Sequence, residues 1–131
     1  MKSIVLVARL LLSLFGIALV VLGILFWTGH ALSLLQLHMT LGGLFVLCMW
    51  VLAVIGFMGR GTRGFALLVL IWSLIVPALG VTQLSLMPGA DHWVVQAVHL
   101  LVGLIAMGLG HALARRIGRP PAEQTAVPES V

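Results

Sequence analysis

Four long apolar runs, separated by short polar or glycine-containing turns, make up most of this chain. They cover residues 4–27, 32–57, 65–87 and 93–114. Each run is longer than the roughly 20 residues that a helix needs to cross the hydrocarbon core of a bilayer. The charge-free part of the first run is also longer than the apolar region of a typical signal peptide, so we expect that helix to be retained. The pattern predicts an all-α, four-helix transmembrane bundle.

The composition supports this prediction and excludes an ordinary soluble protein. Hydrophobic residues make up 62% of the sequence and charged residues 8%, and the mean hydropathy is +1.25. A soluble domain has nearer one quarter charged residues. The formal charge of +4 does not indicate a nucleic-acid partner, because every basic residue flanks an apolar run. The single cysteine, Cys48, cannot form an internal disulfide, and we interpret it as a small apolar core residue.

The positions of the basic residues predict the orientation in the membrane. Three of the five polar segments hold all of them: Lys2 and Arg9, then Arg60 and Arg63, then Arg115, Arg116 and Arg119. The other two connections contain no Lys or Arg. By the positive-inside rule, both termini and the central turn are cytoplasmic, and the chain forms two helical hairpins of the same polarity. We expect a multi-pass protein of the bacterial inner membrane, with residues 1–118 as its transmembrane domain and residues 119–131 as a disordered cytoplasmic tail.

Two histidines lie in matching settings, inside the second and the fourth run. His38 and His99 each follow the head of their run by about six residues, so at 1.5 Å per residue both lie about 9 Å below the outer boundary. Histidine within a membrane span is costly and usually functional. Equal depth on two parallel helices predicts one shared ligand.

A glycine follows each histidine at the fourth position, Gly42 after His38 and Gly103 after His99. Residues i and i+4 share a helical face, so both glycines remove a side chain that would collide with a flat macrocycle. The alternative is that they are small-residue contacts for close helix packing. Gln96, one turn before His99, can hydrogen-bond a propionate, a quinone oxygen or the ring nitrogen of a ligand histidine.

We weighed three ligand states for the histidine pair. Haem b suits two neutral imidazoles that face each other inside a four-helix bundle. A copper or zinc ion is the competitor, although tetrahedral zinc needs three or four protein ligands, and Cys48 and Asp91 are expected at other depths. The third state has no ligand, with the histidines hydrogen-bonded to each other or to Gln96. We expect a single haem b with His38 and His99 as axial ligands.

The helical core, with its histidine pair on parallel helices and Gly42 and Gly103 beneath, resembles the bacterial membrane cytochromes b of the broad cytochrome b561 type. The resemblance implies electron transfer through haem. This chain departs from that pattern because His111 near the inner side has no second histidine, which puts two-haem transfer across the membrane in doubt. One haem near the outer face fits electron exchange with quinone or a periplasmic partner, haem-based sensing or haem handling, and we expect such a role rather than a stand-alone enzyme.

A second hypothesis comes from the shortness of the connections between the runs. They leave little surface outside the membrane for a soluble substrate, which favours a structural or accessory subunit of a larger membrane complex, or a homo-oligomer. The remaining histidines fit roles without chemistry. We expect His30 and His92 to be interfacial polar residues at the outer mouth, and His111 to contact lipid headgroups. A transporter is disfavoured because we expect no carboxylate inside the bundle for ion coupling.

Overall fold

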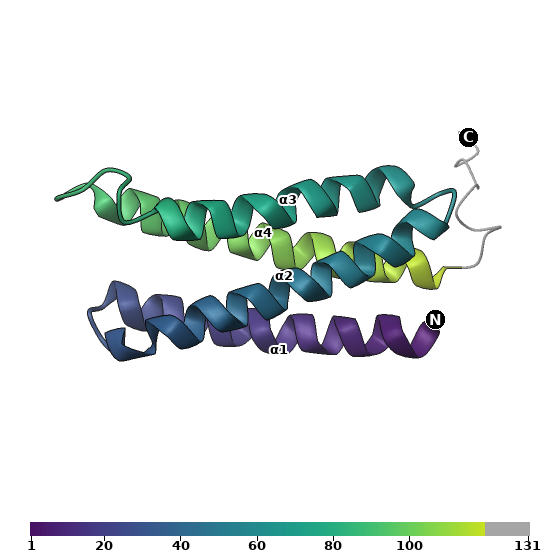
Figure 1. Ribbon diagram of the computed structural model, residues 1–131, viewed down its shortest axis with the longest axis horizontal. Helices are drawn as coiled ribbons and strands as arrows, with labels where there is room; N and C mark the ends of the chain where they lie inside the picture. Colours follow the sequence, from purple (N-terminus) through teal and green to yellow (C-terminus); the bar gives the residue numbers. More distant parts are fainter. Residues whose placement is uncertain (120–131) are drawn as a thin grey trace, which may run out of the picture.

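The computed structural model describes residues 1–119, and these residues are all-helical, with no strand among them. Figure 1 shows the four long helices, which are α1 (Lys2–Trp27), α2 (Leu35–Met58), α3 (Arg63–Thr82) and α4 (His92–Gly118). A 3-10 turn, η1 (Leu32–Leu34), precedes α2. The predicted all-α, four-helix fold is confirmed. Except for Arg119, the predicted tail lies outside the described residues.

All four helices are long and apolar enough to cross a membrane. The bundle buries only a minor share of each apolar window, between 17% and 39%. Large aliphatic side chains therefore cover its outer surface, including Leu6, Val54, Leu74 and Leu101. Water would not tolerate so much contiguous apolar surface, whereas lipid tails solvate it.

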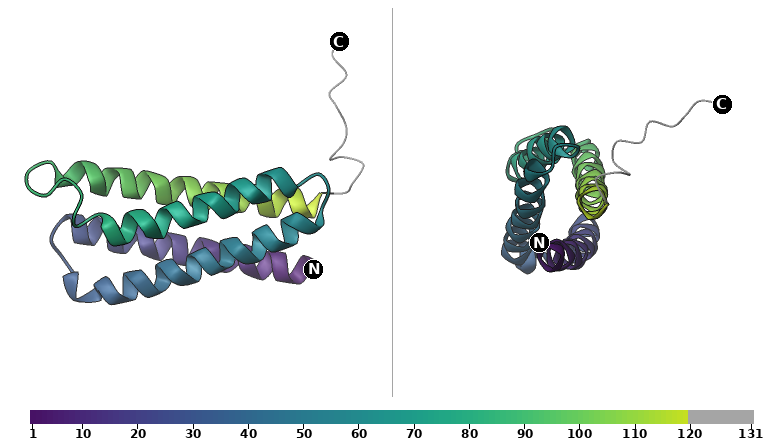
Figure 2. Two further views of the ribbon diagram at one scale, coloured as in Figure 1. Left: turned by 45° about the horizontal axis from the view of Figure 1, so that its top comes forward. Right: turned by 90° about the vertical axis from the view of Figure 1, so that its right-hand side faces the viewer.

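The helices form a ring in which α1 packs against α2 and α4, and α3 packs against the same two neighbours. Helices α2 and α4 also contact each other across the ring. The end-on view in Figure 2 shows these two helices on opposite sides of the ring. The N-terminus, the α2–α3 turn and the last residues of α4 lie together at one end (Figure 1). We call this the basic end, because the chain's Lys and Arg residues all lie toward it. We call the opposite end, with residues 28–34 and 83–91, the loop end.

Tight packing is concentrated toward the basic end. Glycines there receive side chains from neighbouring helices. A Cβ added at Gly110 would lie 2.6 Å from Leu12, and one at Gly56 would lie 3.0 Å from Leu113. Both leucines are fully buried. This is the close, small-residue packing that holds helices together in lipid, where the hydrophobic effect gives no attraction between them.

The half toward the loop end is packed more loosely. Within residues 20–42 and 76–103, the buried hydrophobic side chains are Leu22 and Val95 alone. One interhelical hydrogen bond reaches this half from Trp72, whose indole N–H donates to the carbonyl of Val102 at 3.1 Å. Buried side chains are therefore concentrated toward the basic end, and few lie toward the loop end.

Helix α3 ends at Thr82, whereas the apolar run predicted a helix to residue 87. The amides of Ser85 and Leu86 donate to the carbonyl of Thr82, which turns the chain at that point. Met87 then adopts a left-handed conformation with φ 48°, directly before Pro88. A residue that precedes proline is disfavoured in the α-helical region, so the helix cannot continue through this segment.

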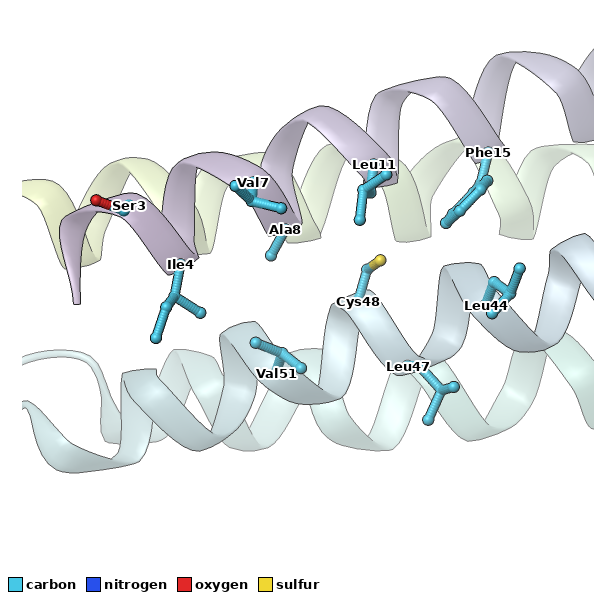
Figure 3. Close-up of a pocket in the computed structure, with 10 residues that line it drawn as sticks. All are labelled: Ser3, Ile4, Val7, Ala8, Leu11, Phe15, Leu44, Leu47, Cys48 and Val51. Atoms are coloured by element: carbon cyan, nitrogen blue, oxygen red, sulfur yellow. The ribbon is translucent and has the colours of Figure 1, made fainter.

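A surface groove of about 490 Å³ lies between α1 and α2 toward the basic end (Figure 3). Apolar side chains line most of the groove. Phe15 and Leu44 lie at the end toward the middle of the bundle, and Ser3 supplies a hydroxyl at the other end. Cys48, the free cysteine, also borders it. Such a surface suits hydrocarbon, and it does not include the histidines.

Candidate functional site

The structure brings His38 and His99 together. His38 lies in the first turn of α2, and His99 lies two turns inside α4. Because these helices contact each other across the ring, the two imidazoles meet, with ring centroids 6.4 Å apart and ring planes inclined by 48°. Both side chains are partly buried.

The Nδ1 atoms of both imidazoles are buried without a hydrogen-bond partner among the described residues. A buried polar nitrogen without a partner costs free energy, so native proteins rarely leave one unsatisfied. Here two such atoms belong to a single pair of facing rings. Each of these nitrogens therefore needs a partner outside the described residues, such as water or a ligand.

Two residues that the sequence pattern did not identify complete the surroundings of the pair. The ring of Phe26 on α1 packs edge-on against His38, with centroids 5.4 Å apart. Gly80 on α3 faces His99, and a Cβ added at Gly80 would lie 3.2 Å from the ring atom Cε1 of His99. All four helices therefore contribute to one layer of the bundle. A glycine near the loop end of α3 was the only signal in the sequence.

Gly42 and Gly103 lie one turn beyond the histidines, toward the basic end. A Cβ added at either glycine would meet nothing within 4 Å. This contrasts with Gly16, Gly56 and Gly110, which abut side chains of other helices. Within the described chain, Gly42 and Gly103 are therefore bordered by open space rather than by a packed neighbour.

Gln96 lies one turn from His99 on α4, toward the loop end, and is partly buried. Within residues 1–119, no hydrogen bond joins it to either imidazole. A role for its amide toward a bound ligand therefore stays a prediction.

The donor set of the site consists of two imidazoles. The described residues contain no group of three or more His, Cys, Asp or Glu side chains that could hold a metal ion. Cys48 lies ten positions beyond His38 on α2, about 15 Å along the axis. Asp91 precedes α4 at the loop end. Tetrahedral zinc needs further protein ligands, whereas haem already supplies four nitrogens and requires two axial ones.

The spacing of the rings is also compatible with a shared metal. A single ion bound by one nitrogen of each imidazole requires two rings that lie close to each other. The observed separation is 6.4 Å. The residues present thus offer the type and number of donors that haem takes from a protein, and neither of the two described cavities borders them.

The other three histidines do not join the pair. His30 contacts Thr28 at 3.1 Å, and His92 contacts the carbonyl of Leu86 at 3.4 Å; both contacts are exposed at the loop end. His111 lies toward the basic end and contacts Ser13 of α1 at 3.1 Å. This interhelical contact was not foreseen, since the sequence indicated a headgroup contact for His111.

No protein-family model, curated protein or solved structure matches this chain.

Proposed function

We propose that this chain is a membrane haem b protein in which His38 and His99 are the two axial ligands of a single haem. One observation carries the proposal: two imidazoles from different helices face each other at 6.4 Å with buried, partnerless nitrogens. The proposed role is electron transfer or haem-linked redox chemistry, with quinone or a periplasmic protein as the partner. When bound, the haem would supply the one-electron chemistry.

The residues of the chain have separate tasks in this proposal. His38 and His99 hold the iron, and their axial ligation is one control on its reduction potential. Gly42 and Gly103 leave room for the edge of the macrocycle, because no side chain fills the space beside them. Gly80 lets His99 approach α3, and Phe26 packs against His38 and helps to keep water from it. Gln96 is the candidate donor to a propionate, a quinone oxygen or a ligand ring.

The orientation is part of the proposal. The positive-inside rule places the basic end in the cytoplasm, with two hairpins of the same polarity and both termini inside. The haem would then lie toward the outer leaflet of a bacterial inner membrane. Trp27 and Trp93, both exposed near the loop end, suit an aromatic belt at that outer interface.

An absorption spectrum of the purified full-length protein, oxidised and then reduced with dithionite, tests the proposal. We expect a Soret band and the sharp reduced bands of low-spin, six-coordinate haem. His38→Ala and His99→Ala should each abolish the low-spin spectrum. The double variant should lose no more than either single one, because one ligand alone no longer makes the site.

His111→Ala is the matched control, since it removes the same ring from the same helix about 18 Å further along the axis. It should leave the spectrum unchanged. A colourless protein from haem-replete cells that also gains no Soret band on addition of hemin would refute the haem assignment. Elemental analysis of the same sample for copper and zinc tests the bare-metal alternative.

The second candidate is a structural or accessory subunit without a cofactor. It is favoured by the extensive exposed apolar surface of all four helices and by the short connections between them. Co-purification with a fixed membrane partner that survives replacement of both His38 and His99 by alanine would support this alternative. Loss of the partner together with the haem would support the redox role.

A further inference from the structure

Toward the basic end, α1 and α4 are joined by a polar contact that the proposed haem site does not use. The hydroxyl of Ser13 lies 3.1 Å from Nε2 of His111. The same hydroxyl donates to the carbonyl of Arg9 at 3.1 Å. Its proton is thereby used, so the hydroxyl accepts from the Nε2–H of His111. Both side chains are partly buried between two membrane helices.

Two arginines lie close to this contact. Arg9 precedes Ser13 by four residues on α1, and Arg115 follows His111 by four residues on α4. Residues four apart share a helical face, and the two helices run in opposite directions. Both guanidinium groups therefore lie about one turn beyond the Ser13–His111 contact, toward the basic end. Their positive charges are close enough to act on the His111 ring.

The charge of this cluster is not balanced within the described chain. Asp91 is the single carboxylate residue in positions 1–119, and it lies at the loop end. Within that range, no ion pair joins Arg9 or Arg115 to a carboxylate. Arg9 is seven residues inside α1, about 10 Å from the start of the helix. An arginine at that depth in a bilayer is costly unless it meets an anion or reaches the interface.

We propose that Arg9 and Arg115, next to the Ser13–His111 contact, form a binding site for the phosphate of an anionic phospholipid, between α1 and α4 in the leaflet at the basic end. Guanidinium groups bind phosphate through paired, charge-assisted hydrogen bonds. Basic pockets between transmembrane helices bind anionic headgroups in the same way. Two cations favour a lipid with a net negative charge over a zwitterionic one. The site is independent of haem and of which face of the membrane is cytoplasmic.

Native mass spectrometry of the delipidated full-length protein in detergent, titrated with phosphatidylglycerol or phosphatidylcholine, tests the site. We expect one phosphatidylglycerol to bind preferentially. The variant with Arg9→Gln and Arg115→Gln should bind it about tenfold or more weakly, since each hydrogen bond to a charged group contributes substantially. The variant with Lys2→Gln and Arg60→Gln removes the same amount of charge from the same end. It should reduce phosphatidylglycerol binding less than about twofold, because attraction between exposed charges is weak.

Ser13→Ala is a second variant that keeps every charge and tests the geometry. It should weaken phosphatidylglycerol binding severalfold, because α1 and α4, which carry the two arginines, lose the hydrogen bond that joins them there. The proposal would be overturned if both double-charge variants lost phosphatidylglycerol binding equally. It would also be overturned if the unaltered protein bound phosphatidylglycerol and phosphatidylcholine equally. Full competition by inorganic phosphate would show a site for a free anion instead of a lipid. A severalfold gain in Glu123→Gln with Glu129→Gln would show that the chain's own carboxylates occupy the site, which would also overturn it.

Discussion

Gly80 of α3 lies against the imidazole of His99 of α4, so that a Cβ added at Gly80 would stand 3.2 Å from Cε1 and 3.9 Å from Nε2 of that ring. This approach is tighter than ordinary van der Waals contact. The absence of a side chain at Gly80 therefore sets how close α3 comes to the histidine pair, although Gly80 itself offers no group to a ligand.

Replacement of Gly80 by leucine should displace the His99 ring. If His99 is an axial ligand, we expect loss of most low-spin haem absorption while the protein still inserts and purifies. Gly43→Leu is the matched control, because a Cβ at Gly43 would meet nothing within 4 Å. Wild-type spectra from both variants would show that the position of His99 does not depend on α3.

Replacement of Gly103 by leucine distinguishes a flat cofactor from a small ion without altering a ligand. The space beside Gly103 is open in the described chain, so the new side chain should fit there and exclude a macrocycle by volume. We expect haem to be lost, whereas a bound copper or zinc ion would be retained. Gly108→Leu, on the same helix and on an exposed face, should change neither. Full haem retention in the Gly103 variant would mean that this glycine does not border the cofactor.

Leu12 should be a main determinant of stability. It is fully buried and fills the space beside Gly110. Leu12→Ala should lower the free energy of unfolding by about 1–3 kcal/mol, because it removes packing contacts, whereas the transfer from water that adds to this loss in soluble proteins has no counterpart in lipid. Leu14→Ala, at a position that is 62% exposed, should change it by about 0.5 kcal/mol or less. Unfolding in mixed micelles with increasing sodium dodecyl sulfate measures both, and similar values would argue against the described packing.

The orientation can be tested with reporter fusions. A reporter that is active only in the cytoplasm should be active when joined after Arg119 and inactive when inserted near Gly89. A reporter that is active only outside should give the reverse pattern. Because each insertion serves as the control for the other, the opposite pattern from both reporters would place the histidine pair near the inner leaflet.

Much of the fold follows from hydrophobic patterning, because lipid imposes a length and a composition on any helix that crosses it. The turn after Thr82 was missed, since Leu84, Leu86 and Met87 are apolar and hydropathy alone does not distinguish them from helix. Their place in a turn depends on the backbone bonds to Thr82 and on Pro88. Local hydrogen bonding, rather than solvent preference, ends this helix.

The meeting of His38 and His99 was predictable because depth can be counted along a helix. Depth does not give the rotation of a helix about its axis or the order of helices around the ring. Gly80 and Phe26 reach the pair only because α3 and α1 present those faces, and Ser13 meets His111 only because α1 adjoins α4. Such relationships depend on packing between helices, which a single sequence does not specify.

Because the packing differs along the bundle, we expect the assembly of the helices and the binding of a ligand to depend on different halves of it. Interlocked side chains toward the basic end, such as Leu12 against Gly110, can hold the four helices together before anything binds. The half around His38 and His99 has fewer buried side chains, so we expect it to open more readily and to let a ligand enter. We expect the empty protein to be already inserted and assembled, with amide hydrogen exchange faster around the histidines than around Leu12. If haem binds to His38 and His99, its uptake would then require movement in the half toward the loop end alone.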